Sequence, residues 1–198
     1  MRKKGILVGC FLMVMVMPAA AVSAQETELT EKEATAATEA GQQGISEISE
    51  ECLFGEFETM TLEGDKADQE IFAEADLSMV NIWATYCGPC IREMPDLGTL
   101  SREYEEKGVQ IIGMIADVAE AGDEDAEAIV EYTQADYTHL IMSADLLQSY
   151  MSQVQVVPTT VFVDREGKQV GEVYAGSRTK EEWAEIIEEL LQELEDEE

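Results

Sequence analysis

Basic residues are scarce in this chain. Twelve Lys and Arg residues stand against 43 Asp and Glu residues over 198 positions, which gives a net charge of −31 at pH 7. A protein that binds nucleic acid or an anionic membrane surface needs clustered positive charge to attract phosphate groups. The acidic excess therefore argues against both kinds of partner, and it is typical of a protein whose charge keeps it soluble.

Histidine and cysteine are also rare, with one His and four Cys. A zinc site formed by Cys52, Cys87, Cys90 and His139 would need a second half-site of recognisable spacing, which the sequence lacks. Three of the cysteines lie beyond residue 24, and one close pair with one left over fits a redox couple better than a fold held together by disulfides. The sequence contains neither a Cys-X-X-Cys-His haem motif nor a glycine-rich phosphate loop. We therefore expect no metal and no cofactor.

Long apolar runs are absent except near the N-terminus, where residues 6–17 follow the basic start MRKKG. Small residues at 19–24 then precede Gln25, as at a signal-peptidase cleavage site. We predict a cleaved signal peptide over residues 1–24 and an extracytoplasmic protein, secreted or on the cell surface. Two alternatives remain: an uncleaved anchor, since residues 6–24 are just long enough to span a bilayer, and a lipoprotein attached through Cys10.

The rest of the chain divides by composition. Residues 25–50 are acidic and contain no aromatic side chain, so they cannot bury enough surface to form a core, and we predict a disordered tether. A single folded domain is predicted over residues 51–198. In it, apolar runs of strand length alternate with amphipathic helical patterns: strands at 57–62, 77–84, 109–117, 138–142, 159–164 and 169–176, and helices at 87–108, 123–135, 144–151 and from 180 onward. This order predicts an α/β fold with a mixed central sheet flanked by helices.

The closest pair of cysteines is Cys87 and Cys90, separated by Gly88 and Pro89 at the junction of a buried strand and a helix. Free N–H groups and the helix dipole at a helix start stabilise a thiolate, and proline suits the first turn. We predict a redox couple in which exposed Cys87 attacks first and buried Cys90 resolves the mixed disulfide. Half of a metal site and two unrelated core thiols are the alternatives.

A second feature is the dipeptide Val157-Pro158, which opens a strand pattern. A peptide bond before proline is the one that can be cis, although the local sequence alone favours trans. In a fold of this class the loop would face the cysteine turn, and its backbone would pair with an extended substrate peptide.

Two stretches carry a family resemblance: NIWATYCGPCIREMP at 81–95 and VPTTVFVDREGKQVGEVYAG at 157–176. Together they closely resemble the TlpA/ResA-like extracytoplasmic thiol–disulfide oxidoreductases of the thioredoxin superfamily. The resemblance covers about residues 54–195. It implies a thioredoxin fold with an N-terminal β-hairpin and an extra βα element, and a cis Pro158. It also implies reduction of protein disulfides outside the membrane, including those of apocytochrome c, with electrons from a CcdA-type membrane protein.

The resemblance also implies roles for single residues. Cys87 becomes the nucleophile, Cys90 the resolving thiol, and Glu93 a buried carboxyl that tunes the thiols and can shuttle a proton if burial raises its pKa. Helical phase alone is equally compatible with a Glu93 that faces solvent. The substrate-binding surface is predicted to comprise Trp83, Tyr86, Gly88, Pro89, Val157 and Pro158. Asn81 departs from the pattern, because cytosolic thioredoxins place a buried aspartate there, and Tyr86 replaces a tryptophan.

We therefore predict a monomeric enzyme that acts mainly as a disulfide reductase. The Gly-Pro dipeptide is that of low-potential thioredoxins, near about −270 mV, unlike strong oxidants near about −120 mV. An oxidase or isomerase on the same fold and a non-catalytic client-binding chaperone are the alternatives. A peroxiredoxin does not fit, because Thr85 lies two rather than three residues before Cys87. We expect Cys52 to be a lone thiol, and His139 and Trp183 to be structural.

Overall fold

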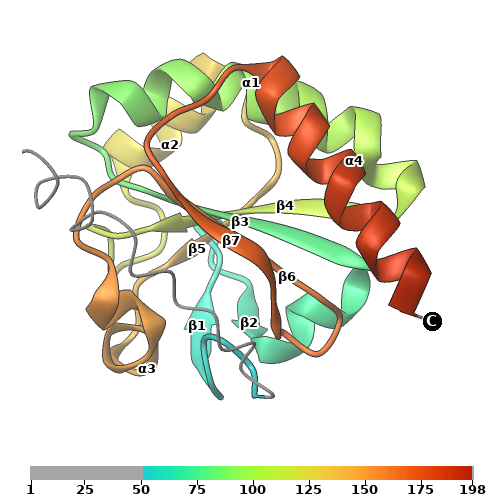
Figure 1. The fold of residues 1–198 in the computed structure, drawn as a ribbon. Coiled ribbons are helices and arrows are strands. Elements are labelled where there is room, and N and C mark those ends of the chain that lie inside the picture. The colour runs from blue at the N-terminus through green and yellow to red at the C-terminus, as the bar shows by residue number, and fades with distance from the viewer. Residues whose placement is uncertain (1–50, 198) are drawn as a thin grey trace, which may run out of the picture. The chain divides into compact units, whose positions relative to one another are not determined.

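A five-stranded mixed sheet organises the part of the chain that the computed structural model describes, residues 51–197 (Figure 1). The predicted signal peptide over 1–24 and the predicted tether over 25–50 lie outside the described residues. The strand order is β5-β4-β3-β6-β7, with bounds β3 (Leu77–Trp83), β4 (Val109–Ile115), β5 (Thr138–Ile141), β6 (Thr159–Val163) and β7 (Gln169–Ala175). Strands β3, β4 and β5 are parallel, whereas β6 and β7 are antiparallel to their neighbours. The predicted mixed sheet and element order are confirmed.

Strand β3 is the centre of the sheet, and all seven of its residues are buried. It pairs with β4 on one side and with β6 on the other. Because successive side chains of a strand point to opposite faces, Met79 and Trp83 join one apolar cluster and Val80 and Ile82 join another. The sheet therefore separates two cores. The site described below begins at the carboxyl end of this strand.

Three helices cover one face of the sheet, and shorter elements cover the other (Figure 1). The first group is α1 (Gly88–Tyr104), α2 (Glu124–Thr133) and α4 (Lys180–Glu197). The second comprises α3 (Ala144–Gln148) and the hairpin of β1 (Glu58–Met60) and β2 (Lys66–Asp68). Short 3₁₀ helices lie between these elements, at η1 (Gln69–Glu74), η2 (Glu105–Lys107) and η3 (Tyr150–Gln153). In the described part of the chain no helix is long and apolar enough to cross a membrane.

The N-terminal hairpin is present, but its first strand is shorter than the predicted 57–62. The chain turns after Met60 so that Leu62 donates its backbone N–H to the carbonyl oxygen of His139 at 2.8 Å. Just before that turn, the Thr59 hydroxyl donates to the carbonyl oxygen of Ile141 at 2.7 Å. The hairpin is thereby attached to the outer edge of β5.

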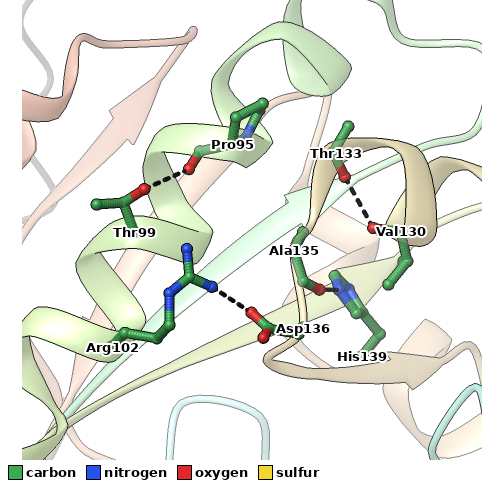
Figure 2. Close-up of polar contacts among 8 residues, drawn as sticks. All are labelled: Pro95, Thr99, Arg102, Val130, Thr133, Ala135, Asp136 and His139. Atoms are coloured by element: carbon green, nitrogen blue, oxygen red, sulfur yellow. Dashed lines mark hydrogen bonds and ion pairs between the residues drawn. The ribbon is translucent and has the colours of Figure 1, made fainter.

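Helix α1 lies tightly against the connection that follows α2. Gly98 faces the backbone of Gln134, and a side-chain carbon at position 98 would overlap the carbonyl oxygen of that residue. Gln134 ends α2 with a left-handed backbone, φ +55°. One turn further along α1, Arg102 forms an ion pair with Asp136 of the same connection (Figure 2). These contacts fix α2 beside the helix that carries the cysteines.

Candidate active site

Cys87 and Cys90 form a disulfide at the start of α1, with their Cα atoms 5.3 Å apart. Cys87 is the N-cap of the helix and has an extended backbone, so the chain leaves the sheet and enters the helix at this residue. Its backbone N–H is bonded to the carbonyl oxygen of Ala84 at 3.0 Å, which closes the turn after β3. Pro89 lies in the first helical turn, where its missing N–H costs little. The strand-to-helix placement predicted from sequence is confirmed.

The two sulfur atoms differ in accessibility in the predicted order. Cys87 is 5% exposed, whereas Cys90 is completely buried. The prediction that Cys87 is exposed was wrong, since the residue is buried and the Val157 carbonyl oxygen lies 3.5 Å from its Sγ atom. The peptide bond between Val157 and Pro158 is cis, as the family resemblance implied. A nucleophilic role for Cys87 and a resolving role for Cys90 agree with these positions and remain predictions.

The helix start supplies the favourable electrostatics at Cys87. The backbone N–H of Cys90 points at the Cys87 Sγ atom from 3.2 Å, so it would donate to a thiolate at that position. The guanidinium of Arg92 lies near Gly88, but this side chain is exposed. On the other side, Asp117 accepts bonds from the backbone N–H and the hydroxyl of Thr85, at 3.0 and 2.6 Å. A thiolate at Cys87 would thus be stabilised mainly by the backbone dipoles at the helix start.

Glu93 is buried inside the protein rather than facing solvent, with 3% exposure. It follows Cys90 by three residues, so both side chains leave the same face of α1. Its Oε1 atom accepts from the Asn81 amide at 3.1 Å, and its Oε2 atom accepts from the Arg178 backbone N–H at 3.1 Å. Burial raises the pKa of the Glu93 carboxyl, and these hydrogen bonds only partly oppose the increase. This carboxyl is therefore more readily protonated than an exposed one.

The partners of Glu93 were not predicted from the sequence. Asn81 lies in the middle of β3 and donates to the Thr160 hydroxyl at 3.0 Å as well as to Glu93. The sequence signal for such a contact was the polar residue Asn81 within an otherwise apolar strand pattern, because a buried polar side chain needs a partner. Burial raises the pKa of the Tyr137 phenol, and the charge of Glu93 adds to the increase. Its hydroxyl and the Asn81 Oδ1 atom are buried and have no hydrogen-bond partner among residues 51–197.

Trp83 is not part of the substrate-binding surface, contrary to the prediction. Its side chain has no exposed area, and its Nε1–H donates to the Nδ1 atom of His139 at 3.2 Å. His139 in turn donates from Nε2 to the Ala135 carbonyl oxygen at 2.8 Å (Figure 2). Burial lowers the pKa of His139 to about 4, so the ring is neutral at physiological pH. Trp83 therefore supports the end of β3 from within the core.

The other predicted substrate-binding residues lie around the disulfide. Tyr86 is 77% exposed, and Gly88 and Pro89 are exposed beside it. Val157 is half-buried and Pro158 is buried behind it. Contact of these residues with a substrate remains a prediction.

The alternative zinc site finds no geometric support. Within residues 51–197 no three His, Cys, Asp or Glu side chains are grouped so that they could hold a metal ion. Both ring nitrogens of His139 are engaged by protein groups. Cys52 is a free thiol, and its Sγ atom lies 3.5 Å from the Gly55 carbonyl oxygen. Burial raises the pKa of this thiol, which keeps it protonated and weakly reactive.

Comparisons with known proteins agree with this geometry. The family model described as Redoxin matches residues 31–189. Thiol-disulfide oxidoreductase ResA of Halalkalibacterium halodurans is 30% identical over 152 residues, which cover 75% of this chain and 77% of the relative. ResA of Bacillus thuringiensis subsp. konkukian is 29% identical over 134 residues, or 68% of this chain and 74% of the relative. Thioredoxin-like protein YneN of Bacillus subtilis is 28% identical over 127 residues, or 64% and 72%.

Solved structures support the same fold. A thiol:disulfide interchange protein of the thioredoxin family from Chlorobium tepidum superposes with a TM-score of 0.58 at 21% identity, covering 69% of this chain and 93% of that one. StoA from Bacillus subtilis superposes with a TM-score of 0.54 at 17% identity, covering 66% and 95%. At such identities the likeness establishes the thioredoxin fold, as the resemblance implied.

Proposed function

Because this chain belongs to the Redoxin family, and within it to the ResA-like thiol–disulfide oxidoreductases of the thioredoxin superfamily, we propose that it reduces disulfides of secreted or surface proteins outside the cytoplasm. Apocytochrome c is one such client. The electrons come from the dithiol of a CcdA-type membrane protein. The observation that carries the proposal is the Cys87–Cys90 disulfide at a helix start, with the buried Glu93 carboxyl one turn further on.

The reaction is a pair of thiol–disulfide exchanges. In the reduced enzyme, the Cys87 thiolate attacks one sulfur of the client disulfide, which forms a mixed disulfide and releases a client thiolate. The Cys90 thiol then loses its proton and attacks the Cys87 sulfur. This step forms the Cys87–Cys90 disulfide and releases the second client thiolate. Two electrons pass to the client, each released thiolate takes up a proton, and the enzyme reaches the oxidised form described above.

Glu93 is suited to the second exchange. Cys90 is fully buried, so water has little access to its proton. A carboxylate on the same helix face, three residues further on, is the most effective base when its pKa lies close to the working pH. Burial moves the pKa of Glu93 in that direction. The carboxyl therefore acts as the base for Cys90 when the client is released.

The reducing direction rests on how little stabilises a thiolate at Cys87. A dithiol enzyme becomes a strong oxidant when its reduced form is strongly stabilised. Among residues 51–197, the polar groups that contact the Cys87 sulfur are one backbone N–H and one carbonyl oxygen. The carboxylate of Asp117, which is bonded to Thr85 two residues before Cys87, disfavours a further negative charge in this turn. A weakly stabilised thiolate goes with a low reduction potential.

The deciding experiment is the reduction potential of the Cys87–Cys90 couple, measured by equilibration with a thiol redox buffer and read out by alkylation. A potential below about −240 mV is expected for a reductase fed from the membrane. A potential above about −180 mV would reverse the direction of electron flow and make the protein an oxidase or isomerase. In either case the Cys87→Ser variant must lose turnover. A variant that kept full function would identify a client-binding chaperone instead.

A further inference from the structure

An apolar groove lies beside the disulfide, on the side of α2. Its volume is about 500 Å³, and its walls include Tyr86 and Ile91, which flank the cysteine couple in sequence, and Ile129 and Tyr132 of α2. Asp125 also lines this groove. The groove is therefore lined both by residues next to the cysteines in sequence and by residues of α2.

The sequence of α2 explains why this face is open. Ala126 and Thr133 are the buried residues of the helix and face the core. Asp125, Ile129 and Tyr132 follow one another at spacings of four and three residues, so they form a second stripe along the helix. No element of residues 51–197 packs over Tyr132, which is 84% exposed. This stripe is one wall of the groove.

The two tyrosines of this groove are highly exposed. Tyr132 and Tyr86 are the two most exposed large apolar residues in the described part of the chain, at 84% and 77%. Val156, at 55%, adjoins Val157, whose carbonyl oxygen is next to the Cys87 sulfur. Aromatic side chains of this kind are the usual anchors of protein-binding surfaces.

We propose that this groove, between the cysteine turn and α2, is a specificity site for the client polypeptide, which places an apolar side chain between Tyr86 and Tyr132 and a basic side chain near Asp125. The inference rests on the proposed reductase function and names the substrates that this function favours. An extended chain advances about 3.3 Å per residue, and Ile91 lies about 6 Å along α1 from Cys87. The apolar side chain therefore stands roughly two to four residues from the attacked cysteine.

The charges favour a basic neighbour. Asp125 lines the groove, and Glu124 and Glu127 share the first turns of α2 with it. Asp117 is bonded to Thr85, which is also part of the groove wall. A client with Lys or Arg next to its apolar residue satisfies both features, whereas an acidic neighbour is repelled. The groove thus selects one class of disulfide among all those that Cys87 can reach chemically.

The test compares peptide disulfides with a small disulfide in the full-length chain, with dithiothreitol as reductant. The peptides carry one intramolecular disulfide and, three residues from a cysteine, Phe next to Lys, Ala next to Lys, or Phe next to Glu. Oxidised glutathione serves as the small disulfide, since it is too short to fill the groove. The measured quantity is kcat/KM for each peptide divided by kcat/KM for oxidised glutathione.

Tyr132→Ala is expected to lower this ratio about tenfold for the Phe–Lys peptide and to leave the ratio for the Ala–Lys peptide nearly unchanged. Asp125→Asn should reduce the preference for Lys over Glu. Leu147→Ala is the matched control, because Leu147 is 55% exposed on α3 and distant in sequence from the groove. Since Tyr132 and Leu147 are both exposed, neither truncation removes core packing.

Three results would overturn the inference, and they are distinguishable. An equal ratio in the wild type and Tyr132→Ala would mean that clients do not use the groove. A wild-type dimer that Tyr132→Ala converts to a monomer, measured by sedimentation, would assign the groove to self-association. Failure of the wild type to reduce oxidised glutathione as well as every peptide would instead refute the proposed function itself.

Discussion

The Glu93 carboxyl accepts a hydrogen bond from the Asn81 side chain at 3.1 Å, and only 3% of Glu93 is exposed to solvent. The contact joins the helix that carries the cysteines to the central strand of the sheet. Asn81 cannot ionise, so Glu93 is the titratable group of this pair. In the proposed mechanism the Cys90 proton therefore passes to Glu93 and not to residue 81.

We expect Glu93→Gln to slow client release by about 10- to 100-fold, since an amide cannot accept the Cys90 proton. The pH–rate profile should lose its dependence on a group titrating above 4.5, the ordinary value of a Glu carboxyl. Asp96→Asn, on the same helix, is the control. Stopped-flow kinetics over pH 4–9 would measure both, and an unchanged profile would show that Glu93 has only a structural role.

Glu93→Gln should also change the pH dependence of stability. Because the pKa of Glu93 is raised in the folded protein, the folded state holds this proton more tightly than the unfolded state. Its contribution to stability is therefore complete below about pH 4.5 and decreases as the pH rises through the higher folded pKa. The variant should gain stability relative to wild type at pH 8 but not at pH 4. Urea denaturation of the oxidised proteins at both pH values would test this.

His139 should change the pH dependence of stability in the opposite direction. The chain contains one histidine, so a single imidazole signal in an NMR titration reports on His139 alone. We expect a pKa of about 4 instead of 6.5. The unfolded state then binds the additional proton, and stability falls as the pH decreases from 6.5 to 4, by roughly 3 kcal/mol in all. A titration near pH 6.5 would contradict the buried, neutral ring bonded to Trp83.

Gly113→Ala should destabilise the protein by about 1–3 kcal/mol through overpacking. A side-chain carbon at position 113 would overlap the His139 ring and approach the Trp83 Nε1 atom to 3.0 Å. The cost should be much smaller in a His139→Ala background, where the ring is absent. A double-mutant cycle by denaturant unfolding measures this coupling. Additive effects would mean that the strand, not the ring, resists the substitution.

Cys90→Ser should accumulate a mixed disulfide between Cys87 and the client, whereas Cys87→Ser should lose turnover by more than about 100-fold. Cys52→Ser is the control, because the raised pKa of that thiol keeps it unreactive at neutral pH. Mass spectrometry of acid-quenched reactions would detect the trapped adduct. Accumulation of the adduct in Cys87→Ser instead would exchange the two roles.

The sequence predicted the inner strands β3, β4 and β6 well, because they are short apolar runs that need burial on both faces. It also located the cysteine couple, since a Cys-Gly-Pro-Cys run between a strand and a helix restricts the local geometry strongly. Tertiary partners were less accessible to sequence reasoning. Trp83 belongs to the motif, yet it is buried against His139, which lies in β5, 56 residues further along the chain. The exposed stripe of Ile129 and Tyr132 could not be predicted from the sequence, because the face of α2 that is buried depends on where the helix packs.

Both edges of the sheet carry features that hinder pairing with a further strand. The hairpin caps β5 through the bond from Leu62 to His139. On the opposite edge, β7 has an irregular register with β6 and a left-handed glycine at position 171. Exposed sheet edges template the stacking of unfolded chains, and bulges and covering segments suppress it. If the proposed client reduction holds, the protein can thus meet a partly folded client at its disulfide without offering an open sheet edge for aggregation.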